Sequence, residues 1–217
     1  MKNSNITKWV SALSILAIGA GCGGGDEGAH NPPADAGIDA PLDAVAVTPD
    51  AGDGGSCGTT TELMANGGFE EGNATWTTSG RVITNMGQDG YPARAGTFKA
   101  YFGGFGYGNT GTLSQKAALP AEACKATLSY WVRVLSDEPD SAGEADTLTV
   151  QLRDANGAVL ETLSKLSNRT LSGSYIQKTV DLTPYKGKTV EVRFVGIEDR
   201  QTPTSFFVDD VSLSYTH

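Results

Sequence analysis

The stretch SFFVDDVSL, residues 205–213, lies near the end of the chain and alternates between apolar and polar residues as a β-strand does. This alternation places Phe207, Val211 and Leu213 on one face. Asp209 has the same parity, so the pattern predicts a carboxylate among apolar side chains. Because a buried carboxylate without partners is costly, we expect a cation or a set of hydrogen-bond donors beside Asp209.

Short alternating segments recur along most of the chain. Two are especially regular: CKATLSYWVRV, residues 124–134, and DTLTVQLRD, residues 146–154. Similar runs, separated by turn sequences such as DANGA and LTPYKGK, occupy residues 81–85, 97–102, 110–117, 159–166, 175–182, 189–196 and 206–215. The sequence has no amphipathic helix of three turns. The pattern therefore predicts an all-β protein, an antiparallel two-sheet sandwich, with inward-facing Ala126, Leu128, Tyr130, Val132, Val134, Leu148, Val150 and Leu152.

Residues 1–21 have the features of a secretory signal peptide. Lys2 and Lys8 precede the apolar run WVSALSILAIGAG, which is too short to span a bilayer. The stretch AIGAGC, residues 17–22, resembles the lipobox of bacterial lipoproteins. This resemblance implies that Cys22 is lipidated and anchors the mature protein in the bacterial cell envelope. The alternative is an ordinary signal peptide cleaved nearby. The segment that follows resembles the stalks of lipoproteins that hold a domain off the outer membrane.

Residues 22–56 have the composition of a disordered, acidic tether. The part from Gly23 to Ser56 contains seven acidic residues and neither Lys nor Arg, with many Gly, Ala and Pro. It also has no aromatic side chain, so it cannot bury a hydrophobic core. We expect this segment to hold a folded domain away from the membrane.

The remaining residues, 57–217, are enough for one domain with a substantial core. They carry 14 basic and 18 acidic residues and no basic patch, which argues against nucleic acid as a partner. Cys57 and Cys124 form an even pair in an oxidising compartment, so we expect a disulfide. We also expect the domain to be a monomer.

Three stretches resemble the galactose-binding-like jelly rolls. They are NGGFEEGNATWTT at residues 66–78, the long segment at 101–134 that begins YFGGFGYGN, and SFFVDDVSLS at 205–214. This family includes many carbohydrate-binding modules and accessory domains of secreted bacterial peptidases and glycosidases. The resemblance implies a jelly-roll β-sandwich, but its members bind different ligands, so it does not by itself imply a function.

The resemblance also implies one structural calcium ion. In the family, a Glu after the N-terminal strand and an Asp in the last strand converge on the ion, and the matching residues here are Glu70 and Asp209. Calcium takes six to eight oxygen ligands, which would account for an inward carboxylate. The alternative is that Asp209 accepts hydrogen bonds from backbone amides or from Ser or Thr hydroxyls.

The segment SDEPDSAGEAD, residues 136–146, is a second acidic feature, with five carboxylates in eleven residues. It lacks the spacing of an EF-hand loop. Two interpretations remain open: a second calcium-binding loop, or a solvated hairpin loop.

The sequence gives little support for catalysis. Its two histidines are His30, in the tether, and His217, the last residue, so the domain cannot contain a Ser-His-Asp or Cys-His arrangement. A glycosidase needs only two carboxylates, and no pair is marked by the sequence. We expect a protein that is not an enzyme.

Two places have the side chains that bind sugars, namely aromatic rings with polar neighbours. The first is the glycine-rich loop at residues 101–109, which presents Phe105 and Tyr107. The second is the outward face of the central strands, where Trp131 and Arg133 lie, with Gln151 and Arg153 on a strand expected beside theirs. Trp131 has an alternative interpretation, in which a long loop covers it and Arg133 or Arg153 stacks on its ring.

Together these features predict a surface-anchored, non-catalytic module that binds an extracellular or envelope carbohydrate. A structural or protein-interaction domain, with an envelope protein as its partner, is the alternative. Its signature would be the burial of Phe105, Tyr107 and Trp131 under loops. A cryptic glycoside hydrolase is a third possibility, and a cleft with two carboxylates of raised pKa would favour it.

Overall fold

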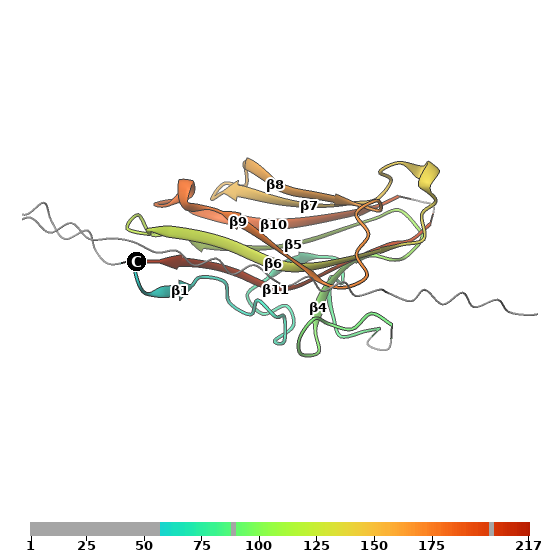
Figure 1. Cartoon of the computed structure of the whole chain (residues 1–217), viewed down its shortest axis with the longest axis horizontal. Helices are drawn as coiled ribbons and strands as arrows, with labels where there is room; N and C mark the ends of the chain where they lie inside the picture. The colour runs from blue at the N-terminus through green and yellow to red at the C-terminus, as the bar shows by residue number, and fades with distance from the viewer. Residues whose placement is uncertain (1–56, 88–89, 200–201) are drawn as a thin grey trace, which may run out of the picture. The chain divides into compact units, whose positions relative to one another are not determined.

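The computed structural model describes residues 57–87, 90–199 and 202–217 (Figure 1). The predicted signal peptide, the lipidation site Cys22 and the predicted tether therefore lie outside the described residues. The only helices in the described ranges are two 3₁₀ turns, η1 (Asp140–Ala142) and η2 (Thr183–Tyr185). No helix among these residues is long and apolar enough to cross a membrane.

The strands form two antiparallel sheets, which face each other in Figure 1. The first, called here the β11 sheet, has the order β3-β4-β11-β6-β9, and β1 pairs with the end of β11. The second, the β10 sheet, has the order β2-β5-β10-β7-β8. The prediction of an antiparallel two-sheet jelly-roll sandwich is confirmed. The strands of the β11 sheet are β1 (Thr60–Glu62), β3 (Ile83–Thr84), β4 (Lys99–Gly103), β6 (Lys125–Ser136), β9 (Ile176–Asp181) and β11 (Thr204–Thr216). Those of the β10 sheet are β2 (Thr77–Ser79), β5 (Asn109–Ala118), β7 (Thr147–Asp154), β8 (Val159–Ser167) and β10 (Thr189–Glu198).

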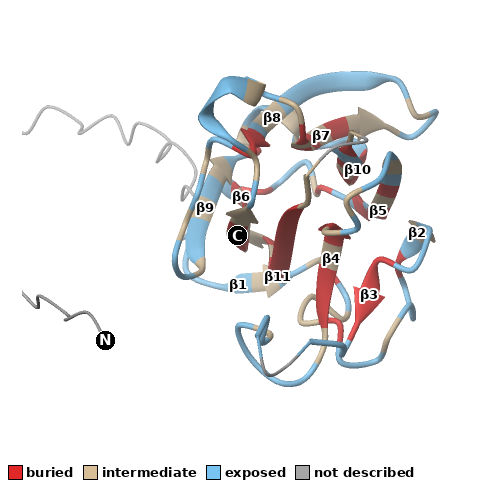
Figure 2. Cartoon of the chain, turned by 90° about the vertical axis from the view of Figure 1, so that its right-hand side faces the viewer, coloured by how far each residue is buried: buried red, intermediate tan, exposed pale blue. Residues whose placement is uncertain are grey.

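The hydrophobic core lies between the two sheets. The predicted inward residues of β6 and β7 are all buried in it, because alternation turns every second side chain of each strand toward the facing sheet. Tyr130 and Phe194, from opposite sheets, meet edge to face with ring centroids 5.4 Å apart. In Figure 2 the central strands β4 and β11 are largely buried, whereas the edge strands β8 and β9 are largely exposed.

The alternation predicted for β11 is wrong at its centre. The pairing of β11 with β6 shifts between Asp209 and Ser212, and Asp210 adopts a positive φ of 46°. This β-bulge inserts an extra residue and reverses the alternation. The core therefore receives Val211 after the bulge but Phe206 and Val208 before it. Phe207 and Asp209 consequently lie on the outer face of the β11 sheet.

The two ends of the domain meet beside β1. The predicted disulfide between Cys57 and Cys124 is present, with the two Cα atoms 6.1 Å apart. The amide groups of Gly58 and Thr59 donate to the carbonyl oxygen of His217, both at 3.1 Å. The disulfide thus joins the first described residue to the connection between β5 and β6. Closing a loop of 67 residues stabilises a domain by about 4 kcal/mol in the chain-entropy model.

Candidate functional site

The outer face of the β11 sheet is covered by the connection that leads from β3 to β4. Figure 1 draws this connection in green below β4. Two carboxylates hold its last residues. Asp209 Oδ2 accepts hydrogen bonds from the amides of Arg94 and Ala95, at 2.8 and 3.3 Å. Glu70 Oε1 accepts from the amides of Thr97 and Phe98, both at 2.9 Å. Backbone amides of the connection are thus anchored by these two carboxylates.

Asp209 is fully buried and still has several hydrogen-bond donors. Besides the two amides at Oδ2, its Oδ1 accepts from the amide of Asp210 at 2.9 Å. Burial raises the pKa of Asp209 to about 6, although these three hydrogen bonds oppose the shift. Lys99 is buried nearby and donates to the carbonyl oxygen of Met86 at 2.7 Å; burial lowers its pKa, and the charge of Asp209 opposes this. The hydrogen-bonded alternative accounts for the buried carboxylate.

The geometry at Glu70 and Asp209 does not resemble a prepared calcium site. The groups that approach these carboxylates are N–H donors, whose partial positive charge faces the oxygens where a cation would sit. Calcium needs several converging oxygens instead. A calcium ion between Glu70 and Asp209 stays a prediction.

A different group of carboxylates could hold a metal ion. One oxygen each from Glu138, Asp146 and Asp199 lies within 4.8 Å of the others. Glu138 and Asp146 belong to the acidic segment 136–146, for which a calcium loop was one of two interpretations. Asp199 follows β10 and carried no signal in the sequence, because nothing local shows that it meets a segment fifty residues earlier.

Four aromatic residues, called here the aromatic strip, run along one side of the outer face: Tyr91, Tyr101, Phe105 and Tyr107. Tyr91 and Tyr101 rest on the fully buried ring of Phe207, with centroids 5.4 and 4.8 Å away. Phe105 lies 6.4 Å from Tyr101, and Tyr107 lies 5.3 Å from Phe105. Exposed fractions of 41% for Tyr91, 50% for Phe105 and 59% for Tyr107 leave these rings accessible to a ligand.

A buried glutamate positions the aromatic loop. Glu198, at the end of β10, accepts from the amide of Phe105 at 2.9 and 3.1 Å and from the amide of Gly106 at 2.9 Å. Its side chain is almost completely buried. Charge-assisted hydrogen bonds of this kind are strong, so the loop is held in one conformation. Sequence reasoning missed Glu198, since its partner loop lies about ninety residues earlier.

Three pockets border the strip and supply polar groups beside the rings. The first, of about 110 Å³, is lined by Tyr91, Tyr101, Gly104, Leu135, Ser136, Asp137, Pro203 and Ser205. The second, of about 380 Å³, shares part of that wall and is lined by Tyr91, Val134, Leu135, Ser136, Asp137, Leu171, Ser172 and Gly173. A third, of about 80 Å³, lies beside Phe105 and Tyr107 and includes Arg81 and Asn109. Rings and hydroxyl, amide and charged groups therefore lie together.

Trp131 lies on the outer face but is covered. The guanidinium carbon of Arg94 sits 4.1 Å from the centre of its ring, and Arg94 Nη1 also pairs with Asp210 Oδ2 at 2.6 Å. The predicted cation–π contact exists, but its cation comes from the covering connection and not from Arg133 or Arg153. Arg133 lies beside Phe207 in the strand register. Its Nε is buried without an acceptor among the described residues.

The prediction that Gln151 and Arg153 lie beside Trp131 is wrong. Both are on β7, which belongs to the β10 sheet, whereas Trp131 is on β6 of the β11 sheet. Since each of these side chains faces away from the core, the two groups lie on opposite sides of the sandwich. Arg153 Nε instead donates to Gln151 Oε1 at 3.2 Å. Arg193 of β10 lies opposite Gln151 in the register.

Comparison with known proteins supports the fold at low sequence identity. No protein-family model and no curated protein matches the chain. The solved structure of TmCBM61 in complex with β-1,4-galactotriose is 16% identical, with a TM-score of 0.53 over 70% of this chain and 97% of that one. The K3 cleaved adhesin domain of the Lys-gingipain of Porphyromonas gingivalis is 19% identical, with a TM-score of 0.49 over 72% of this chain and 99% of that one. A family 16 carbohydrate-binding module is 24% identical, with a TM-score of 0.40 over 70% and 98%.

An identity this low, even with coverage of nearly the whole of TmCBM61, is informative about architecture alone. The described residues form two antiparallel sheets that enclose one core, in agreement with that comparison. The chain therefore has a jelly-roll fold similar to that of TmCBM61.

Proposed function

We propose that this protein is a non-catalytic module that binds an extracellular or envelope carbohydrate through the aromatic strip. The observation that carries the proposal is the exposure of Tyr91, Phe105 and Tyr107 beside pockets lined by hydroxyl and carboxylate groups. Aromatic rings stack on the apolar face of a pyranose, and polar groups at the edge bind its hydroxyls. A short oligosaccharide is the ligand class that best matches this arrangement.

A protein-interaction domain is expected to bury Phe105, Tyr107 and Trp131 under loops. Phe105 and Tyr107 are at least half exposed, and Trp131 alone is covered. Pockets beside exposed rings favour a small ligand over a flat protein surface. Trp131 and Arg133 are accordingly left out of the proposed contact surface, and so are Gln151 and Arg153.

The absence of a hydrolytic step is part of the proposal. Among the described residues, Asp137 is the single carboxylate that lines the three pockets beside the strip. A glycosidase needs two. Asp209, whose pKa is raised, is fully buried under the covering connection and does not line any of these pockets.

We also propose that a lipid on Cys22 anchors the protein in the bacterial envelope, at the outer membrane, as a monomer. The signal-like residues 1–21 and the acidic residues 22–56 support this placement. The disulfide agrees with an oxidising compartment outside the cytoplasm.

The test is a binding screen of the full chain against plant, microbial and envelope polysaccharides. We expect at least one glycan to bind, with a loss of at least tenfold in affinity in Tyr107→Ala and Phe105→Ala. Leu160→Ala, at an exposed apolar position on β8 of the other sheet, is the matched control and should bind as the wild type does. Silence across the array, with capture of an envelope protein that depends on Tyr107, would instead support the protein-interaction domain.

A further inference from the structure

Three carboxylates from separate parts of the chain meet at one end of the sandwich. Glu138 lies in the connection between β6 and β7, Asp146 immediately precedes β7, and Asp199 immediately follows β10. One oxygen of each lies within 4.8 Å of the others. The cluster is therefore produced by the tertiary fold.

Two of these carboxylates each have one buried oxygen that lacks a hydrogen-bond donor among the described residues. Asp146 is fully buried; its Oδ1 accepts from the amide of Asp199 at 2.7 Å, whereas its Oδ2 has no donor within the described part of the chain. Glu138 Oε1 accepts from the amide of Thr202 at 3.1 Å, and Glu138 Oε2 is likewise buried without a described donor. Buried acceptors are nearly always satisfied in folded proteins, so these two oxygens indicate a missing partner.

Within residues 57–87, 90–199 and 202–217, no cation is found to pair with the two unsatisfied oxygens. None of the ion pairs between residues of the described ranges includes Glu138 or Asp146. Arg169 lines a small pocket together with Glu138, but its Nη1 donates to the carbonyl oxygen of Asp140 at 2.7 Å. Adjacent carboxylates repel one another, and a bound cation would remove that repulsion.

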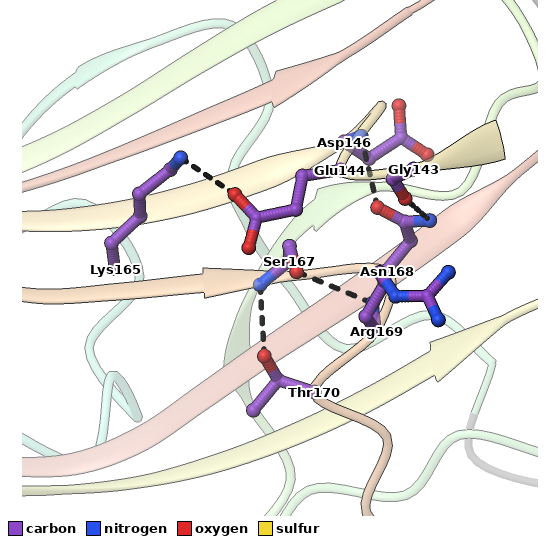
Figure 3. Close-up of polar contacts among 8 residues, drawn as sticks. All are labelled: Gly143, Glu144, Asp146, Lys165, Ser167, Asn168, Arg169 and Thr170. Carbon is purple, nitrogen blue, oxygen red and sulfur yellow. Dashed lines mark hydrogen bonds and ion pairs between the residues drawn. The ribbon is translucent and has the colours of Figure 1, made fainter.

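Neighbouring residues hold the backbone of Asp146 in place by hydrogen bonds, as Figure 3 shows. The amide of Asp146 donates to Asn168 Oδ1 at 3.4 Å, and Asn168 Nδ2 donates to the carbonyl oxygen of Gly143 at 2.8 Å. Lys165 pairs with Glu144 at 2.8 Å, close by. Asp199, whose amide donates to Asp146 Oδ1 at 2.7 Å, is not drawn in this figure. The backbone around Asp146 is thus fixed, and its carboxylate is left for the cluster.

We infer that Glu138, Asp146 and Asp199 form a divalent-cation site, and that its ion is calcium. The three side chains offer only oxygen, the donor that hard cations prefer, and no thiolate or imidazole that would favour zinc. Two oxygens bound to one calcium at about 2.4 Å lie no more than about 4.8 Å apart, and this limit agrees with the observed cluster. Backbone carbonyls and water would complete the six to eight ligands.

The proposed cation site also lies close to the 110 Å³ pocket beside the aromatic strip. It joins the connection after β6 to the connection after β10, and the same two connections meet where the amide of Asp137 donates to the carbonyl oxygen of Pro203 at 3.0 Å. Asp137 and Pro203 line the 110 Å³ pocket beside the aromatic strip. A cation at the cluster therefore stabilises one wall of that pocket.

Calorimetric titration of the full chain with calcium chloride, after treatment with EDTA, tests the site without any glycan. We expect one calcium ion per chain, and a loss of at least tenfold in affinity in Asp146→Asn and in Glu138→Gln. Asp140→Asn, at an exposed carboxylate of the same connection, is the matched control and should bind as the wild type does. If Asp146→Asn does not fold, as judged by its circular dichroism, Glu138→Gln decides, because Glu138 is only partly buried.

Hydrogen exchange supplies a second readout. Calcium should slow the exchange of the Asp199 and Thr202 amides, which donate to the cluster, in the wild type but not in Asp146→Asn. The inference is overturned if the wild type takes up no calcium, or if both cluster variants bind it normally. Loss of the same calcium in Glu70→Gln alone would assign the ion to Glu70 and Asp209 and would also overturn it.

Discussion

Both oxygens of the buried Glu198 carboxylate accept a bifurcated hydrogen bond from the amide of Phe105, at 2.9 and 3.1 Å. This contact connects the last residue of β10 to the loop that carries the exposed rings. Asp209 holds the amide of Arg94 in the same way, and Glu70 holds the amide of Thr97. These three carboxylates thus position the loops around the aromatic strip, and the contact that each one makes can be tested separately.

Replacing Glu198 by Gln should loosen the aromatic loop. The amide side chain can accept at one oxygen only, and its NH₂ group would face a backbone donor. We expect the free energy of unfolding to fall by about 1–3 kcal/mol, together with weaker glycan binding. Urea denaturation and the polysaccharide screen measure the two effects. Glu122→Gln, at an exposed position outside the strip, is the control; an unchanged stability in Glu198→Gln would refute the anchoring role.

Gly104 should be required for the geometry of the strip. Its φ is +79°, and a Cβ there would collide with Tyr101 Oη and Ser205 Oγ, which lie 3.1 Å apart in a hydrogen bond. Gly157 has a φ of +88° and open space around it. Gly157→Ala therefore carries the backbone strain alone, about 1 kcal/mol. Thermal melts should show that Gly104→Ala costs roughly 1–2 kcal/mol more, since it adds overpacking; equal costs would mean that Tyr101 moves aside freely.

Stability should depend on pH through Asp209. Its folded pKa of about 6 exceeds the ordinary value of 3.8, so the folded state binds more protons than the unfolded state between these values. The free energy of unfolding therefore falls as the pH rises through this window. The destabilisation caused by ionised, buried Asp209 is fully present above pH 6. Lowering the pH from 7 to 5 in EDTA should stabilise the protein by about 1 kcal/mol relative to Asp209→Asn.

Urea midpoints of the wild type and of Asp209→Asn at both pH values measure this difference. The variant has no titrating group at the position, and its response serves as the baseline for all other carboxylates. Calcium bound to Asp209 would hold the carboxylate ionised and lower its pKa, which reverses the sign. A calcium-dependent reversal would therefore favour the ion predicted at Glu70 and Asp209.

The strands and their core faces follow from local alternation. In β6 and β7 each inward side chain was predicted correctly, because the period of two is a property of the strand itself. The disulfide followed from cysteine pairing, and the exposure of Phe105 and Tyr107 agreed with their glycine-rich surroundings. These features depend on neighbours in the chain or on composition alone.

The tertiary structure determined which residues of the chain contact one another. The bulge after Asp209 reversed the predicted facing of Phe207, and the separation of β6 from β7 moved Gln151 and Arg153 to the opposite face. Neither Glu198 beneath Phe105 nor Asp199 beside Asp146 could be found from spacing, since each contact joins segments more than fifty residues apart. Alternation specifies which way a side chain points within its strand, but strand register and sheet membership specify what it meets.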